Sequence, residues 1–197
     1  KVTETYDQQR EKNKYRKEKR KKELKHFLDL LDKKEGERVL ELGCSSGFLT
    51  EHLGKVTAID TSEGMLEIAH KKNPLAKCIF GDMFGMKFKD NSFDKVVTMR
   101  VWNHLDEADL KRALREVKRV LKKDGILVFD AEDDSFWRRV AAKIYQGVTV
   151  ITGFKIYQYS FTDLKRILEK EGFKIESGRY LKHRVGRQII LKTKVYN

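Results

Sequence analysis

An acid, a run of small residues and two glycines stand together near residue 40. The segment from Val39 to Gly47 reads Val-Leu-Glu-Leu-Gly-Cys-Ser-Ser-Gly, which predicts a short buried strand that turns sharply into a helix. Gly43 and Gly47 lack a Cβ and would let a ligand approach the main chain closely. Because open parallel sheets bind ligands outside the carboxyl ends of their strands, we expect a binding site at this turn.

Two further acids end or follow the next apolar stretches. Asp60 closes the stretch at residues 56–60, and Asp82 lies in the loop after the stretch at residues 76–80. A carboxylate at the first position can accept hydrogen bonds from both hydroxyls of a ribose, and one at the second position can accept one from an exocyclic amino group. The pattern therefore favours a ligand that contains a nucleoside.

Two common nucleotide-binding motifs do not match this turn. The dinucleotide fingerprint needs glycine at its first, third and sixth positions, where this chain has Gly43, Ser45 and Phe48. No Gly-Lys-Ser/Thr sequence ends the loop, which excludes a P-loop. The sequence therefore argues against a dehydrogenase and against a P-loop protein.

The elements that must position these residues alternate between strand-like and helix-like periodicity, which is typical of an α/β fold. The expected strands lie at residues 39–42, 56–60, 76–80, 93–98 and 126–130, with two closing strands near 173–177 and 187–192. The expected helices lie at residues 48–53, 64–72, 106–122 and 160–171. Gly125 is expected to end the connection that leads into the strand at 126–130.

One domain of this kind accounts for most of the 197 residues. Residues 1–35 are expected to form a basic N-terminal helical arm and lid, and residues 36–197 the domain itself. Residues 131–160 interrupt the alternation and are rich in aromatic side chains, which would either line a substrate pocket or pack in the core.

Taken in order, these motifs resemble those of the class I, Rossmann-like S-adenosylmethionine-dependent methyltransferases, especially the small-molecule branch related to the ubiquinone and menaquinone methyltransferases. The resemblance covers residues 36–130. It rests on the segments 41–47 (Glu-Leu-Gly-Cys-Ser-Ser-Gly), 60–66 (Asp-Thr-Ser-Glu-Gly-Met-Leu) and 81–83 (Gly-Asp-Met), with further landmarks at 93–97 and 119–125. It implies a seven-stranded, mostly parallel sheet in the order 3-2-1-4-5-7-6, with the last strand antiparallel and helices on both faces.

The resemblance also implies S-adenosylmethionine as the cofactor. In the family the acid of the first motif faces the methionine end of the cofactor, the second motif holds the ribose and the third meets the adenine. The cofactor-binding residues that this implies here are Glu41, Gly43, Cys44, Ser45, Gly47, Asp60, Thr61, Met65, Asp82, Met83 and Thr98. The chain departs from the family at Ser45 and Asp124, where glycine is usual.

Two residues after the stretch at 93–98 are candidates for work on the acceptor. Related enzymes often carry histidine at the position of His104, where a general base would serve an acceptor that must lose a proton. The alternative is that His104 caps the next helix or packs there. Arg100 could grip an acidic group on the substrate, or pair with a nearby carboxylate at the surface.

The net charge of +13 is concentrated at the two ends of the chain. Residues 1–25 hold 11 Lys or Arg against 5 acids, and residues 174–197 hold 7 against 1. If these ends lie on one face, they would attract an anionic small molecule or RNA; otherwise they are solvated surface segments. The resemblance favours a small-molecule acceptor, with RNA ribose or ring-nitrogen methylation, or a non-catalytic cofactor- or RNA-binding role, as alternatives.

The cysteines, the apolar runs and the charged fraction indicate where the protein works and whether it holds a metal. Cys44 and Cys78 form no CxxC pair and have no histidine at metal-ligand spacing, so we expect reduced thiols and no metal site. No apolar run reaches the roughly 20 residues that span a bilayer, and we expect a cytoplasmic protein that does not enter the membrane. The charged fraction of 37% is also seen in proteins from hot environments. The sequence leaves the oligomeric state open.

Overall fold

A computed structural model of the chain describes residues 13–133, 157–183 and 186–196. Residues 1–12 of the expected arm and 134–156 of the expected insertion lie outside this range. The helices are α2 (Lys14–Leu31), α3 (Glu63–Lys72), α4 (Glu107–Val120) and α6 (Phe161–Lys170), with short 3-10 turns η1 (Thr50–His52) and η2 (Trp102–His104). The strands are β1 (Val39–Leu42), β2 (Thr57–Asp60), β3 (Lys77–Phe80), β4 (Phe93–Thr98), β5 (Leu121–Asp133), β6 (Phe173–His183) and β7 (Gly186–Val195).

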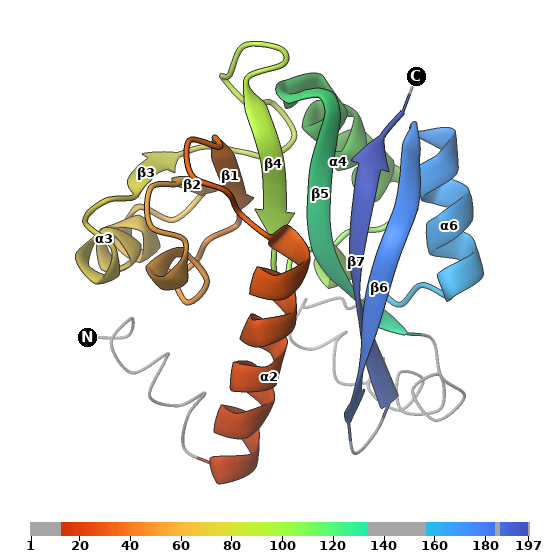
Figure 1. Ribbon diagram of the computed structural model, residues 1–197, viewed down its shortest axis with the longest axis horizontal. Coiled ribbons are helices and arrows are strands. Elements are labelled where there is room, and N and C mark those ends of the chain that lie inside the picture. Colours follow the sequence, from red (N-terminus) through yellow and green to blue (C-terminus); the bar gives the residue numbers. More distant parts are fainter. Residues whose placement is uncertain (1–12, 134–156, 184–185, 197) are drawn as a thin grey trace, which may run out of the picture.

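The seven strands form one sheet in the order β3-β2-β1-β4-β5-β7-β6 (Figure 1). The pairs among β1 to β5 are parallel, whereas β7 is antiparallel to both β5 and β6. This confirms the expected fold class, strand order and antiparallel last strand. The carboxyl ends of β1, β2, β3 and β4 therefore meet at one edge of the sheet.

Helices cover both faces because successive strand residues point to opposite sides. On one face Phe27, Leu30 and Leu31 of α2 pack against a cluster that includes Val39, Val97 and Val128. On the other face α4 and α6 pack against a cluster that includes Leu40, Val96 and Leu127, each of which is next in sequence to one of those three valines. Buried α3 residues Leu66 and Ala69 pack on Ala58 near the edge strand. None of the described helices has the length and apolar character needed to cross a membrane.

Several expected elements differ from the structure. The helix expected at residues 48–53 is reduced to the single 3-10 turn η1, because Gly54 has a left-handed backbone with φ of +61° and the helix cannot continue through it. Gly125 does not end a connection; it lies inside β5, whose pairing with β4 shifts register between Phe93 and Lys95. The two closing strands are also longer than expected and form a long hairpin.

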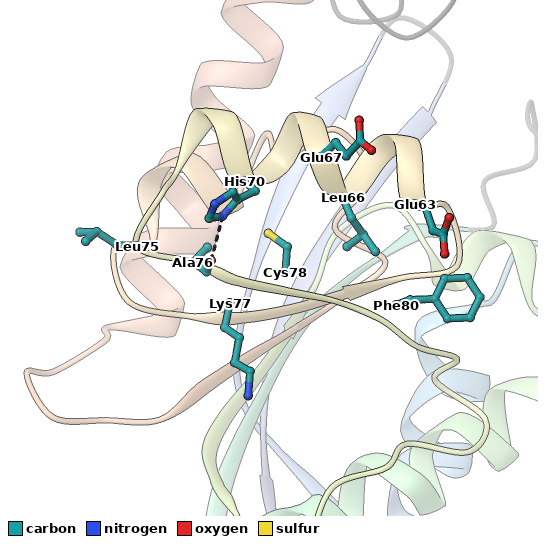
Figure 2. A pocket seen from close by; sticks show the side chains of 9 residues that line it. All are labelled: Glu63, Leu66, Glu67, His70, Leu75, Ala76, Lys77, Cys78 and Phe80. Atoms are coloured by element: carbon teal, nitrogen blue, oxygen red, sulfur yellow. Dashed lines mark hydrogen bonds between the residues drawn. The ribbon is translucent and has the colours of Figure 1, made fainter.

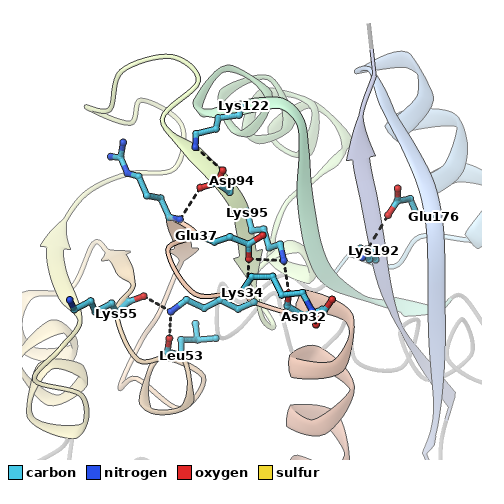
Figure 3. A network of polar contacts seen from close by, with 12 residues as sticks. Asp32, Lys34, Glu37, Leu53, Lys55, Asp94, Lys95, Lys122, Glu176 and Lys192 are labelled. Carbon is cyan, nitrogen blue, oxygen red and sulfur yellow. Dashed lines mark hydrogen bonds and ion pairs between the residues drawn. The ribbon is translucent and has the colours of Figure 1, made fainter.

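The linker between α2 and β1 is held by a polar network at the amino ends of the strands (Figure 3). The Lys95 ammonium, on a side chain that is largely buried, donates to the Asp32 carbonyl oxygen at 2.6 Å and pairs with Glu37 Oε2 at 2.8 Å. Asp94 accepts from the Arg38 backbone N–H at 2.8 Å and pairs with Lys122 at 2.7 Å. These contacts fix where α2 leaves the sheet and so direct the rest of that helix toward the opposite edge.

Replacing Lys95 by methionine tests this network. Met keeps the apolar stem but leaves the Asp32 carbonyl and Glu37 without their cation, so we expect Lys95→Met to lower the free energy of unfolding by about 1–3 kcal/mol. Urea denaturation followed by circular dichroism measures this. Lys194→Met, which removes an exposed pair with Asp124, is the control and should cost less than about 1 kcal/mol. Equal losses in the two variants would contradict the assignment.

Candidate active site

The turn after β1 (residues 43–49, the glycine turn) has an unusual backbone. Gly43, Ser45 and Gly47 have φ values of +64°, +49° and +77°. A Cβ on Gly43 would lie 2.6 Å from Val101 Cγ2, and one on Gly47 would lie 2.6 Å from the Ala69 Cα. Glycine is required at both positions by conformation and by space.

The Asp60 carboxylate joins the ends of β1 and β2. Its Oδ2 accepts the Ser45 backbone N–H at 2.8 Å, and its Oδ1 accepts the Ser62 backbone N–H at 2.9 Å. These bonds orient the carboxylate at the carboxyl edge of the sheet. Each oxygen keeps a further lone pair, so the group can still accept hydrogen bonds from a pair of hydroxyls.

Glu41 lies buried beneath the glycine turn. The Thr50 hydroxyl donates to its Oε2 at 2.7 Å. Burial, with the nearby charge of Asp60 as a smaller cause, raises the pKa of Glu41 to about 8, although the Thr50 hydrogen bond opposes this shift. Glu41 is therefore a proton-bearing group near neutral pH, and Thr50 is a site residue that the sequence gave no reason to single out.

Cys44 and Ser45 face different surroundings. The Cys44 side chain is buried beside Ala58, Leu66 and Ala69, and its backbone N–H donates to the Ile59 carbonyl oxygen at 3.1 Å. The Ser45 hydroxyl contacts Met65 Sδ at 3.8 Å. Burial raises the pKa of the Cys44 thiol, so Cys44 is a neutral packing group and only its main chain can serve a ligand.

The loop after β3 comes to the same edge. The Gly81 backbone N–H donates to the Asp60 carbonyl oxygen at 3.1 Å, which ties this loop to the end of β2. Asp82 is exposed and its Oδ1 accepts the Phe84 backbone N–H at 2.9 Å. Met83 is half-buried against the core, and Thr61 is exposed.

The segment after β4 (residues 98–104, the β4 exit segment) forms the next wall. Thr98 is 1% exposed, and its hydroxyl has no hydrogen-bond partner among the described residues. Arg100 has φ of +60°, and its backbone N–H donates to Asp130 Oδ1 at 2.6 Å. The Arg100 guanidinium pairs with the fully buried carboxylate of Glu23. Arg100 therefore pairs with a carboxylate, but this carboxylate is buried and does not lie at the surface as the alternative for Arg100 expected.

His104 lies exposed in η2, and its backbone N–H donates to the Val101 carbonyl oxygen at 3.0 Å. The residue that caps α4 is Asp106, whose Oδ1 accepts the Asp109 backbone N–H at 2.9 Å. His104 therefore does not cap that helix.

Besides Thr50, sequence reasoning missed three members of this site. Glu23 of α2, Asp130 of β5 and Gln188 of β7 form a buried group in which Gln188 Nε2 donates to Glu23 Oε1 and to Asp130 Oδ2, each at 2.5 Å. Burial and the charge of Glu23 raise the pKa of Asp130 to about 6. Asp130 could have been found as an acid at a strand end, like Asp60, whereas nothing in the local pattern marks Glu23 or Gln188.

This geometry fits an adenosyl ligand with a methionine moiety. Gly43 and Gly47 expose main chain in the glycine turn, and the Asp60 carboxylate can accept two hydroxyls. The Thr98 hydroxyl, which has no partner among the described residues, lies buried at the end of β4. Seven of the eleven expected cofactor residues lie in the turns after β1, β2 and β3, which hydrogen bonds from Ser45 and Gly81 join to β2. The other four lie in regular elements: Glu41 in β1, Asp60 at the end of β2, Met65 in α3 and Thr98 in β4.

Comparison with known proteins identifies relatives of this domain. A family model described as a methyltransferase domain matches residues 40–129. An uncharacterized protein, MJ1252, of Methanocaldococcus jannaschii is 32% identical over 72% of this chain and 63% of its own length. The demethylmenaquinone methyltransferase of Thermotoga maritima is 32% identical over 61% of this chain and 55% of its own. The chain thus spans less than two thirds of the length of these curated relatives.

Solved structures share the fold. The magnesium protoporphyrin IX methyltransferase of Synechocystis PCC 6803, with bound S-adenosylhomocysteine, has a TM-score of 0.73 at 20% identity and covers 93% of this chain and 88% of its own. A Haloferax volcanii methyltransferase, solved in complex with the Trm112 methyltransferase activator, has a TM-score of 0.78 at 17% identity. The match covers 100% of this chain and 98% of that methyltransferase.

The raised pKa of Glu41 makes stability depend on pH. The folded chain holds a proton on Glu41 up to about pH 8, whereas the unfolded chain releases it near pH 4.5, so this residue's contribution to stability is full below pH 4.5 and falls as the pH rises toward 8. Glu41→Gln should remove up to about 1.4 kcal/mol per pH unit of this decline. Urea unfolding from pH 5 to 9 measures the difference.

The control is Glu63→Gln, which changes an exposed glutamate at the start of α3. Its unfolding free energy should follow the wild-type pH profile. A Glu41→Gln profile parallel to the wild type would show that Glu41 is ionised in the folded chain.

Proposed function

We propose that this chain is a class I, Rossmann-like S-adenosylmethionine-dependent methyltransferase that transfers a methyl group to a small-molecule acceptor by direct in-line displacement. The observation that carries the proposal is the Asp60 carboxylate, which two backbone N–H groups hold at the carboxyl ends of β1 and β2, beside a turn in which Gly43 and Gly47 leave the main chain open. The 32% identity to a demethylmenaquinone methyltransferase supports the small-molecule acceptor.

In this proposal Asp60 holds the ribose hydroxyls and Asp82 the adenine amino group, with Met65 and Met83 near the ring. The glycine turn and Thr98 receive the methionine moiety, and Glu41 beneath the turn fixes its shape through Thr50. Thr61 and the Cys44 main chain complete the rim. When bound, the cofactor supplies a methyl group that its sulfonium already activates.

The chain's own contribution to catalysis is then alignment and the exclusion of water, because an activated methyl group needs little covalent help. His104, exposed on η2, is the proposed general base for an acceptor that carries a proton. Arg100 is the proposed contact for an acidic or electron-rich group of the acceptor, presented from the β4 exit segment.

RNA is the second candidate acceptor, and one observation favours it. The basic helix α2 contacts β6 and β7, so the described part of the basic N-terminal segment lies beside the basic C-terminal strands (Figure 1). Arg179 of β6 reaches Asp29 of α2 at 3.5 Å. A surface of this kind attracts phosphate groups in a salt-dependent manner.

Asp60→Ala tests the cofactor site. Loss of the carboxylate removes the acceptor for both ribose hydroxyls and releases two backbone N–H groups, so we expect affinity for S-adenosylhomocysteine to fall at least about a hundredfold, or about 2.7 kcal/mol. Titration calorimetry measures this on the full chain. Asp90→Ala, at an exposed residue that pairs with Arg119, is the control and should bind as the wild type does. Unchanged affinity in Asp60→Ala would refute the site.

The acceptor class is tested with labelled S-adenosylmethionine. Incubation with a metabolite extract and, separately, with total RNA should place the label in the small-molecule fraction. Label in RNA, with transfer that weakens as salt rises, would replace the small-molecule proposal by the RNA one. Cofactor binding with no transfer to either pool would favour a non-catalytic role.

A protein partner is proposed at the open edge of the sheet. A groove of about 700 Å³ lies between α3 and β3, lined by residues of these elements and of the turn between them, apart from the cofactor slot (Figure 2). Phe80 and Leu75 at its ends are 61% and 66% exposed. Because β2 is the only described strand that pairs with β3, the outer edge of β3 offers backbone groups to an added strand, whose alternate side chains would enter the groove. The activator complex of the Haloferax volcanii neighbour supports such a partner.

Phe80→Asp tests this surface. Co-expression with the Haloferax volcanii Trm112 activator should give a complex that co-elutes on gel filtration, and Phe80→Asp should abolish it because a charge would occupy the apolar end of the groove. Phe161→Asp, at an exposed aromatic on α6, is the matched control and should keep the complex. No complex with the wild type, or one indifferent to Phe80→Asp, would refute this surface.

A further inference from the structure

The helix α2 contacts both walls of the proposed cofactor slot. The walls are the glycine turn and the β4 exit segment, which meet where Val101 leaves no room for a Cβ on Gly43. α2 packs through its apolar residues on β5, β6 and β7, and its amino-terminal half runs on toward the carboxyl edge of the sheet (Figure 1). Two side chains one turn apart, Arg20 and Glu23, reach one wall each.

Arg20 reaches the glycine turn. Its side chain is 5% exposed, and its guanidinium carbon lies 3.8 Å from the centre of the Phe48 ring. A cation over an aromatic face at this distance is attracted by the ring's quadrupole, and more so when both groups are shielded from water. Arg20 thereby holds the residue that directly follows Gly47.

Glu23 reaches the β4 exit segment. Its carboxylate is fully buried, pairs with the Arg100 guanidinium through Nη2 and accepts from Arg100 Nε at 3.2 Å. The Arg100 backbone, in a left-handed conformation that is costly for a long side chain, is held from the other side by Asp130. Val101, the next residue, is the one that abuts Gly43.

The group carries a cost that packing does not explain. A fully buried carboxylate and a second, nearly buried one are expensive, and apolar side chains of similar volume would often fold as well or better. Strained backbone and buried charge tend to persist where they set the geometry of a site. Here the strained backbone is that of Arg100, and the buried carboxylates are its partners Glu23 and Asp130. Together these three residues fix the β4 exit segment.

We propose that Arg20 and Glu23 are positioning residues for the cofactor slot: α2 sets the separation of the two walls, Arg20 through Phe48 and Glu23 through Arg100. The inference rests on the proposed function, because it takes the slot between these walls as the cofactor site. It assigns α2 to the binding machinery of the domain, in addition to its role in covering the sheet.

The test is the affinity of the full chain for S-adenosylhomocysteine, measured by titration calorimetry alongside thermal unfolding. Glu23→Gln should weaken binding about tenfold, and Arg100→Met by a similar factor. Because Glu23 acts through Arg100, the double variant should bind no more weakly than Arg100→Met alone. A merely structural pair would lower the unfolding temperature and leave the affinity unchanged.

Two further variants complete the test, one as a control and one as a replacement for Glu23→Gln. Glu171→Gln breaks an arginine–glutamate pair of similar geometry between Arg115 of α4 and the end of α6, and should leave affinity unchanged. If Glu23→Gln does not fold, Arg20→Met carries the test, since it keeps an unbranched apolar stem and removes the guanidinium that lies over Phe48. It should weaken binding about fivefold.

The outcomes separate the two proposals. A wild-type chain that does not bind S-adenosylhomocysteine would overturn the proposed function and this inference together. Wild-type binding with unchanged affinity in Glu23→Gln, or in Arg20→Met if Glu23→Gln does not fold, would overturn the positioning role and leave the proposed function standing. Additive effects of Glu23→Gln and Arg100→Met would also refute the positioning route through Arg100.

Discussion

The hydrogen bonds that Asp60 makes to two backbone N–H groups fix the site more than any other contact. They join the left-handed turn after β1 to the turn after β2, and the Gly81 N–H then joins the loop after β3 to the same point. Three turns that start on separate strands are thereby held at one edge. Because Gly47 packs on α3 and Gly43 on Val101, the turn has no freedom to relax away from that edge.

Much of this arrangement follows from local sequence, and the rest does not. The strand at 39–42, the glycines after it and Asp60 are predictable because each depends on a pattern a few residues long. The strand order came from the family resemblance, since periodicity alone does not rank strands in a sheet. Glu23 and Gln188 were unpredictable because their hydrogen bond joins residues 165 positions apart, and a polar side chain in a charged helix resembles a solvated one.

The two departures from the family pattern have one physical meaning. Ser45 and Asp124 replace the usual glycines, and both have left-handed backbones, with φ of +49° and +62°. A side chain in that conformation costs about 1–2 kcal/mol, and serine and aspartate lose less than bulky residues because their short polar groups can bond locally. The fold thus retains the glycine-like conformation at both positions, and Ser45 adds a hydroxyl that contacts Met65.

The two edges of the sheet are stabilised in different ways. At the amino edge, charges are paired with opposite charges, as in Lys95 with Glu37 and Asp94 with Lys122. At the carboxyl edge, the acids Glu41 and Asp130 are buried and their pKa values are raised, and Thr98 between them in the sheet has a hydroxyl without a described partner. Buried polar groups that are incompletely paired cost stability. The polar residues that a core would exclude are therefore gathered along the strands that end at the proposed cofactor slot. A cofactor bound there would complete their hydrogen bonds, and it would need alignment more than covalent chemistry.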